Sequence, residues 1–305
     1  MREDRPSFTS MAVAGMRAIY SDLPEPLGKV PDPLALGVLP FPFVLPARLV
    51  ERARDNPKAA MALHHAYGVI SAGLTYHVAL RTRAIDDALR DSVAHGVEQI
   101  VMLGAGLDGR AYRLPELAGR CVYEVDHPST QRDKRERVAR TNLRSIAEIV
   151  FVPVDFEKDS LEQSLLRAGF SRDVPSFWIW EGVTMYLSRD AVRATLHAIA
   201  NASAPGSRVA MTYARPPATS AGPARPFVYR GMRALIHAGS KVLGRLGESV
   251  RNFMDSSDLN RLTSGAGFVL VSDEHAVIWA NRYWAGESPG PFEWERLAVL
   301  ERIRN

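Results

Sequence analysis

The sequence predicts an α/β protein built on a doubly wound sheet, and three observations lead to this prediction. First, 46% of the 305 residues are hydrophobic and 24% are charged, as in ordinary globular domains. Second, short apolar runs alternate with helical periodicity from Gly96 onward, which is typical of βα units and a parallel sheet. Third, a glycine-rich turn beginning at Gly104 follows the first apolar run, where such sheets bind ligands.

Seven short apolar runs after Gly96 are interpreted as strands. They occupy residues 98–103, 121–125, 149–153, 177–180, 208–213, 268–273 and 296–303. Helices between them are indicated by Pro128 in a first turn and by Ser188 as an N-cap. Asp159 or Ser160 is expected to cap another helix, which Gly169 ends.

The N-terminal third is predicted to be largely helical. Apolar residues in 47–95 recur at helical spacing, as Ile85, Leu89 and Val93 do, and Gly96 ends the last helix. Residues 24–46 are rich in Pro and Gly with apolar residues between them, which predicts an irregular segment packed across a surface. We interpret this segment as a cover over a pocket.

These patterns divide the chain into an N-terminal helical lid at 1–95 and a core at 96–305. Within the core, residues 214–252 interrupt the βα rhythm and form a segment too long for an ordinary connection. It begins with Pro, Ala and Ser and continues as a basic helical pattern over 230–246. We predict that it forms an inserted lid; the alternative is a surface helix that contacts no ligand.

Composition argues against several classes of protein. The formal charge is +4 and the basic residues are scattered, so nucleic-acid binding is not indicated. No stretch supplies the roughly 20 apolar residues of a membrane-spanning helix, and the start has acidic residues where a signal peptide needs a basic segment followed by an apolar one. We expect a cytoplasmic protein that does not bind membranes. Cys121 is the only cysteine, which excludes an internal disulfide, and no metal site is predicted. The oligomeric state stays open.

The turn at Gly104-Ala105-Gly106 is the first candidate site. Glycines at these positions permit a tight turn and let the backbone approach a ligand closely. Together with Gly109 they also fit the G-x-G-x-x-G pattern of dinucleotide sites. The glycines alone therefore leave NAD and other adenosine ligands open.

Two acidic residues narrow this choice. Asp126 follows the second strand, about 20 residues on, where a carboxylate can accept hydrogen bonds from ribose hydroxyls; its alternative role is an N-cap before Pro128. Asp108 lies inside the glycine turn, where it would repel a pyrophosphate. A cationic, phosphate-free ligand such as S-adenosylmethionine avoids that repulsion and is favoured over NAD.

Further candidates stand at the ends of the third and fourth strands. Asp155 can accept from an adenine amine and Phe156 can cover the base, although a cap and a core residue are the alternatives. Glu181 and Gly182 directly follow an apolar strand at the edge of the sheet. An acid at such a position is seldom an ordinary surface residue, because ionised acids are rarely buried without a partner. Glu181 is placed to face an ammonium group.

Taken together, these motifs resemble the leucine carboxyl methyltransferase family. The resemblance covers residues 47–213 well and rests on Arg81-Thr-Arg83-Ala-Ile-Asp86, Leu103-Gly-Ala-Gly-Leu-Asp108, Glu124-Val-Asp-His-Pro128, Val154-Asp-Phe156 and Trp180-Glu-Gly-Val-Thr-Met-Tyr-Leu187. It implies a class I methyltransferase Rossmann-like fold of seven strands with the last antiparallel. It also implies S-adenosyl-L-methionine as the cofactor.

By the same resemblance, Arg83 is expected to grip the methionine carboxylate and Asp126 to hold the ribose. Glu181 is expected near the sulfonium end. The full set of residues predicted to bind the cofactor is Arg83, Gly104, Ala105, Gly106, Asp108, Asp126, His127, Asp155, Phe156, Glu181 and Gly182.

The predicted activity is transfer of a methyl group to a carboxylate of a small, largely apolar metabolite, as in bacterial secondary metabolism. A carboxylate is already ionised at neutral pH and needs no general base, and no histidine here carries the motif of one. Tyr186 and Arg215 are the candidates to orient the acceptor. A phenolic or alcoholic hydroxyl acceptor, an NAD-dependent oxidoreductase and a non-catalytic binding protein are the alternatives.

Overall fold

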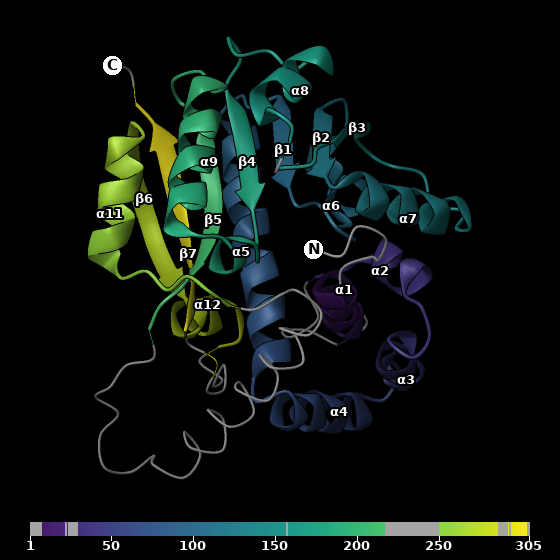
Figure 1. The fold of residues 1–305 in the computed structure, drawn as a ribbon. Helices are drawn as coiled ribbons and strands as arrows, with labels where there is room; N and C mark the ends of the chain where they lie inside the picture. The colour runs from purple at the N-terminus through teal and green to yellow at the C-terminus, as the bar shows by residue number, and fades with distance from the viewer. Residues whose placement is uncertain are drawn as a thin grey trace, which may run out of the picture.

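A seven-stranded sheet lies at the centre of the computed structural model (Figure 1), which describes residues 8–21, 23, 30–156, 158–216, 250–285, 292 and 294–303. The strands are β1 (Gln99–Leu103), β2 (Cys121–Asp126), β3 (Glu148–Pro153), β4 (Ser176–Trp180), β5 (Arg208–Ala214), β6 (Phe268–His275) and β7 (Glu295–Arg302). All seven predicted strands are confirmed, with ends that differ by at most two residues.

The strand order is β3-β2-β1-β4-β5-β7-β6. Strands β1 to β5 run parallel, whereas β7 pairs antiparallel with both β5 and β6, so the predicted antiparallel last strand is confirmed. The order reverses between β1 and β4, since β2 lies on one side of β1 and β4 on the other. Ligands of doubly wound sheets bind at the carboxyl ends of the strands beside such a reversal.

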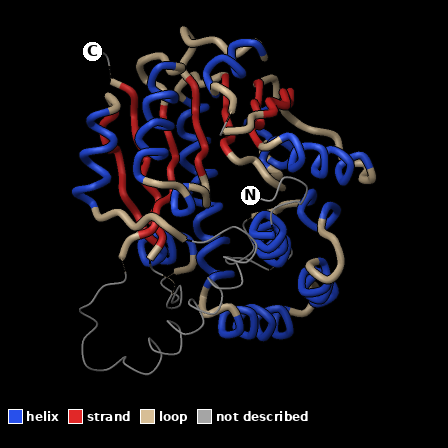
Figure 2. The backbone as a smooth tube through the Cα atoms, in the orientation of Figure 1, coloured by secondary structure: helices blue, strands red, loops and turns tan. Residues whose placement is uncertain are grey.

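Helices cover both faces of the sheet (Figure 2). Alternate residues of β1 point to opposite faces, so Ile100 and Met102 join one apolar cluster while Val101 and Leu103 join the other. Helices α5 (Leu74–Ala94) and α12 (Ala276–Tyr283) contribute to the first cluster. Helices α8 (Leu161–Arg167), α9 (Arg189–Asn201) and α11 (Ser256–Gly265) cover the second face. The buried Trp178 and Trp180 belong to this second core.

The other helical elements between the strands are α6 (Arg110–Arg113), η1 (Pro115–Leu117), α7 (Pro128–Ala139) and η2 (Thr184–Tyr186). The predicted caps are present. Ser188 caps α9, and Ser160, rather than Asp159, caps α8. Gly169 follows the end of α8 with a φ of 89°.

The N-terminal helices are α1 (Phe8–Ser21), α2 (Pro33–Val38), α3 (Val44–Ala53) and α4 (Pro57–Ile70). The prediction of an irregular segment over 24–46 was wrong for its second half, because Asp32 caps α2 by accepting from the Ala35 amide at 3.0 Å and Pro33 occupies the first turn. Residues 24–29 lie outside the described ranges. Helix α1 was not predicted, since the helical pattern was recognised only from Ala47 onward.

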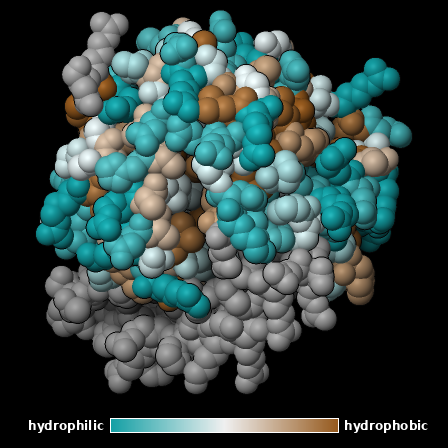
Figure 3. Space-filling view, turned by 45° about the horizontal axis from the view of Figure 1, so that its top comes forward, coloured by the Kyte–Doolittle hydropathy of each residue, from teal (hydrophilic) through white to brown (hydrophobic). Residues whose placement is uncertain are grey.

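The predicted inserted lid at 214–252 stays a prediction, because residues 217–249 lie outside the described part of the chain. The face shown in Figure 3 is mainly hydrophilic with scattered apolar residues, as is usual for a protein surface in water. Among the helices that the structure describes, none combines the length and apolar character needed to cross a membrane.

Candidate active site

The glycine turn and Asp126 meet at the carboxyl edge of β1 and β2. Asp126 Oδ2 accepts a hydrogen bond from the Gly106 amide at 2.6 Å, and Oδ1 accepts one from the His127 amide at 2.7 Å. Burial raises the pKa of Asp126, while these two amides act in the opposite direction. The N-cap of α7 is His127, whose ring nitrogen accepts from Ser129, so Asp126 does not serve as the cap. Its carboxylate instead faces the turn.

The turn requires glycine at two positions. Gly104 and Gly106 have φ values of 69° and 48°, in the left-handed region that residues with a Cβ rarely adopt. A Cβ on Gly104 would lie 2.9 Å from Val183 Cγ2, and one on Gly106 would lie 2.4 Å from Ser10 Oγ. The amides of Gly104 and Ala105 both donate to the Val125 carbonyl, which fixes the turn to the end of β2.

Helix α1 packs directly on this turn. Ser10 Oγ accepts from the Leu107 amide at 2.9 Å, and Arg17 Nη2 donates to the Leu107 carbonyl at 2.7 Å. Arg17 also pairs with Asp32 at 3.2 Å. The N-terminal region therefore contacts the glycine turn directly, while its role as a lid stays a prediction.

Arg110, which is fully buried at the start of α6, joins three carboxylates around the site. Its Nε donates to Asp86 at 2.8 Å, and its Nη1 lies 2.8 Å from Glu181 Oε2 and also contacts Asp108. Burial opposes ionisation of Asp108 and Glu181, but nearby arginines, Arg110 first, outweigh it and lower the pKa of both carboxyls. Asp108 is therefore ionised and already paired.

The pairing of Asp108 weakens one argument made from the sequence. An Asp that is neutralised by Arg110 within the turn would repel a pyrophosphate less than a free carboxylate would. The net charge of all the ion pairs around the site is therefore a better guide to the ligand than Asp108 alone.

Arg81 of α5 links the tips of β4 and β7. Its Nε and Nη2 contact Glu181 Oε1 at 2.9 and 2.8 Å, and its Nη1 contacts both oxygens of Glu295 at 2.9 and 2.7 Å. His77, one helical turn earlier, places Nε2 2.8 Å from Glu295 Oε2. Although burial opposes ionisation, Arg81 and the His77 hydrogen bond lower the pKa of Glu295 to about 2.

Arg83 lies elsewhere on the same helix. Its guanidinium stacks 4.2 Å from the ring centre of Tyr283, whose hydroxyl donates to Asp87 at 2.7 Å. Residues two apart on a helix point in nearly opposite directions, so Arg81 and Arg83 cannot both face the strand tips. The structure places Arg81 beside Glu181, while Nη1 of Arg83 is buried and has no hydrogen-bond partner among the described residues.

The connected ion pairs form what we call the buried charge network. It contains four arginines and five carboxylates, which are Arg17, Arg81, Arg110, Arg113, Asp32, Asp86, Asp108, Glu181 and Glu295. The neutral His77 contacts this network through Glu295. Burial lowers the pKa of His77, so its imidazole is uncharged at pH 7. The network therefore carries one net negative charge.

The remaining predicted residues lie at the rim. Phe156 is 53% exposed, and Asp155 pairs with Lys158 at 2.7 Å. Gly182 has a φ of 70° and donates its amide to Thr212 Oγ1 at 2.8 Å, which fixes the chain as it leaves β4. These positions do not test the assignment of Asp155 and Phe156 to the adenine, which stays a prediction.

The two candidate acceptor residues differ in their surroundings. Tyr186 is half-buried at the end of η2, and its amide donates to the Val183 carbonyl at 3.0 Å. Arg215 is exposed directly after β5, where its amide donates to the Trp294 carbonyl at 2.6 Å. Their roles stay predictions.

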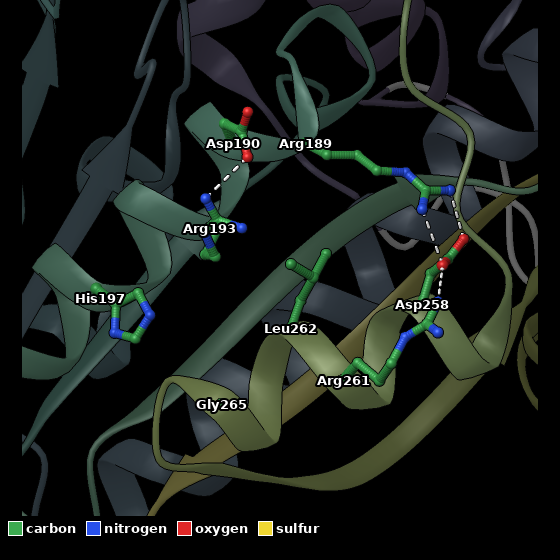
Figure 4. Close-up of a pocket in the computed structure, with 8 residues that line it drawn as sticks. All are labelled: Arg189, Asp190, Arg193, His197, Asp258, Arg261, Leu262 and Gly265. Carbon is green, nitrogen blue, oxygen red and sulfur yellow. Dashed lines mark hydrogen bonds and ion pairs between the residues drawn. The ribbon is translucent and has the colours of Figure 1, made fainter.

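A hollow of about 370 Å³ lies between α9 and α11 (Figure 4). Arg189 and Arg261 both contact Asp258, and Arg193 pairs with Asp190 at 2.9 Å. Its charged groups therefore largely satisfy one another. In the described ranges, no group of three His, Cys, Asp or Glu side chains is arranged to hold a metal ion.

Comparison with known proteins bears on this site. The profile of the family described as leucine carboxyl methyltransferase matches residues 10–200. This chain belongs to that family. The match covers most of α1 together with the glycine turn, Asp126 and Glu181, and so includes most of the predicted site.

Individual relatives of this family member are mycobacterial proteins provisionally named S-adenosyl-L-methionine-dependent methyltransferases. One from Mycobacterium sp. (strain JLS) is 43% identical over 134 residues, which are 44% of this chain and 43% of the relative. One from Mycobacterium bovis is 38% identical over 157 residues, 52% of this chain and 48% of the relative. The aligned segments thus span less than half the length of these relatives.

Two solved structures share the fold. A protein from Thermobifida fusca, provisionally described as a methyltransferase, aligns with a TM-score of 0.53 and 18% identity over 84% of this chain and 92% of its own. A protein of the DUF574 family from Streptomyces avermitilis aligns with a TM-score of 0.52 and 16% identity, over 84% and 96%. At these identities the likeness concerns the fold alone.

Several site residues escaped the sequence analysis. Arg81 begins one of the motifs that carry the resemblance but is given no role by it, and Arg110 and Glu295 have no local signal because their partners lie far away in the chain. The four-residue spacing of His77 and Arg81 was a usable signal, since it places both on one helix face. Nothing local to Glu295 indicated its role.

Proposed function

We propose that this member of the leucine carboxyl methyltransferase family is an S-adenosyl-L-methionine-dependent O-methyltransferase that esterifies a carboxylate of a small, largely apolar metabolite. The observation that carries the proposal is the meeting of Asp126, the glycine turn and Glu181 at the carboxyl edge beside the reversal of strand order. The family match and the names of the mycobacterial relatives support it.

The charge of the site fits this cofactor. S-adenosylmethionine carries a sulfonium, an ammonium and a carboxylate, and so one net positive charge at pH 7. The buried charge network carries one net negative charge and is shielded from water. Opposite charges attract more strongly in a buried site than in water, whereas a dinucleotide would add negative charge to an excess of carboxylates.

In this proposal Asp126 accepts hydrogen bonds from the ribose hydroxyls, and Gly104, Ala105 and Gly106 let the backbone approach the amino-acid portion. Glu181 faces the ammonium group. We add Arg81 as a candidate for the methionine carboxylate because it contacts Glu181. Arg83 keeps that role as the competing assignment.

Asp155, Phe156, His127 and Gly182 complete the predicted surface for the adenine and ribose. Asp108 contributes through Arg110, with which it is paired. These assignments rest on their places at the strand tips.

The chain's contribution to the reaction is alignment and exclusion of water. When bound, the cofactor supplies an electrophilic methyl group on its sulfonium, and an acceptor oxygen must approach it in line. Tyr186 and Arg215 are proposed to orient the acceptor, since a guanidinium can hold a carboxylate through two parallel hydrogen bonds. A carboxylate acceptor is already ionised, so no general base is needed.

The first test is calorimetry of the purified protein with S-adenosylmethionine and, separately, with NAD⁺. Binding of the first and not the second is expected. Binding of NAD⁺ alone would identify the site as a dinucleotide site and contradict the proposal.

The second test uses cofactor labelled in the methyl group and a panel of small carboxylic acids, phenols and alcohols. Alkaline hydrolysis releases labelled methanol from a methyl ester but not from a methyl ether. Label released by base supports the carboxylate assignment. Base-stable product would establish the hydroxyl alternative, and cofactor binding with no transfer to any acceptor would favour a binding protein.

A further inference from the structure

We propose that Glu295 is a positioning residue for Arg81, supported by His77, and that it thereby sets the affinity of the site for the methionine end of the cofactor. This inference rests on the proposed function. It assigns a role in the cofactor site to the C-terminal strand, which lies outside the segment 10–200 that matches the family.

The topology brings Glu295 to the site. It is the first residue of β7, which runs antiparallel to β5, so its register partner is Ala214 at the end of β5. The start of an antiparallel strand lies at the carboxyl edge of its parallel neighbours. Glu295 therefore reaches the edge where Glu181 directly follows β4, the strand on the other side of β5, although the two residues are far apart in sequence.

The contacts divide the guanidinium of Arg81 between two carboxylates. Both oxygens of Glu295 lie within 2.9 Å of Nη1, while Nε and Nη2 contact Glu181. Glu181 is shared with Arg110, but within the described part of the chain Glu295 pairs with no arginine other than Arg81. Glu295 therefore holds one edge of Arg81, and the other edge faces Glu181 and the proposed cofactor.

His77 orients the carboxylate of Glu295, which in turn positions Arg81. Its imidazole is fully buried and contacts Glu295 Oε2 through Nε2 at 2.8 Å. A neutral imidazole donates from the nitrogen that faces a carboxylate, so this contact directs Glu295 without cancelling its charge. The rings of Phe292 and Trp279 lie 4.7 and 5.7 Å from the imidazole ring and limit its movement.

These contacts determine what loss of Glu295 would do. Without it, the long side chain of Arg81 keeps only Glu181, and it can then pair with that carboxylate in more than one arrangement. Cofactor binding must then order Arg81, which lowers affinity without removing any group that touches the cofactor. Glu295 is thus proposed to affect the affinity for the cofactor only through Arg81.

The experiment is calorimetry of S-adenosylmethionine with the full chain carrying Glu295→Gln, which keeps the shape of the side chain and removes its charge. We expect Kd to rise about tenfold. Asp273→Asn is the matched control, because it removes the ion pair of the adjacent Arg296 at 2.8 Å without touching Arg81. Its Kd should stay within about twofold of wild type.

A double-mutant cycle separates positioning from general stability. In an Arg81→Met background, Glu295→Gln should cause no further loss of affinity. An equal loss in both backgrounds, or a folded Glu295→Gln protein with wild-type Kd, would overturn the inference. Absence of binding by the wild type would instead reject the proposed function on which it depends.

A second pair of variants covers the case in which Glu295→Gln does not fold. His77→Gln keeps an amide donor near the position of Nε2, whereas His77→Asn is too short to reach Glu295. We expect Kd to rise about threefold for His77→Asn and to stay near wild type for His77→Gln. Equal affinities of these two variants would overturn the inference.

Discussion

Arg110 Nη1 lies 2.8 Å from Glu181 Oε2 and joins the helix after β1 to the tip of β4 in a fully buried position. Arg110→Met should destabilise the protein by about 3–5 kcal/mol, because it leaves Asp86, Asp108 and Glu181 buried without their shared partner. Urea unfolding measures this change. Arg193→Met, which removes an exposed pair, should change the free energy of unfolding by less than about 1 kcal/mol.

Asp126→Asn tests the ribose assignment. A carboxylate that accepts hydrogen bonds contributes about 1.5–3 kcal/mol, so the variant should bind S-adenosylmethionine roughly 10–100-fold more weakly. Calorimetry gives the Kd directly. Asp133→Asn is the control, because Asp133 lies on α7, soon after Asp126 in the chain, and pairs with Arg137 at 2.7 Å. This variant should bind S-adenosylmethionine as tightly as wild type. Equal affinity of Asp126→Asn and wild type would remove Asp126 from the site.

Arg81→Lys and Arg83→Lys distinguish the two arginines. Lys keeps the charge but cannot form two parallel hydrogen bonds with a carboxylate. If Arg81 holds the methionine carboxylate, Arg81→Lys should raise the Kd for S-adenosylmethionine about tenfold or more, and Arg83→Lys should have little effect. The reverse ranking would assign the methionine carboxylate to Arg83 instead of Arg81.

His64 should make stability fall in acid. Burial, followed by the charge of His65, lowers the pKa of His64 to about 4 from its ordinary 6.5. The unfolded chain therefore takes up a proton before the folded chain does. This contribution is complete above about pH 6.5 and is lost as pH falls toward 4, by about 3 kcal/mol in all.

Urea unfolding of wild type and His64→Gln at pH 7.5 and pH 4.5 checks this. The wild type should lose about 2–3 kcal/mol more than the variant between the two conditions. His95→Gln, which changes a 70% exposed ring, should follow the wild type. An identical loss in wild type and His64→Gln would show that His64 is not responsible.

Local patterns determined much of this fold. Each strand was predictable because a short apolar run between turn-forming residues is itself the signal, and the glycine turn was predictable because Gly104 must adopt a positive φ. Asp126 was predictable as a neighbour of that turn because consecutive parallel strands end at one edge of the sheet.

What the tertiary structure decided was the pairing of charges across long separations and the phase of the helices. The Arg81–Glu295 contact joins residues 214 positions apart, and no local pattern around either residue specifies the other. Whether Arg81 or Arg83 faces the strand tips depends on how α5 is rotated about its axis relative to the sheet. That rotation is set by the packing of the whole apolar face of α5. The sequence alone thus determined the strands and the turn, because their signals are local, while the partners of the buried arginines required the assembled fold.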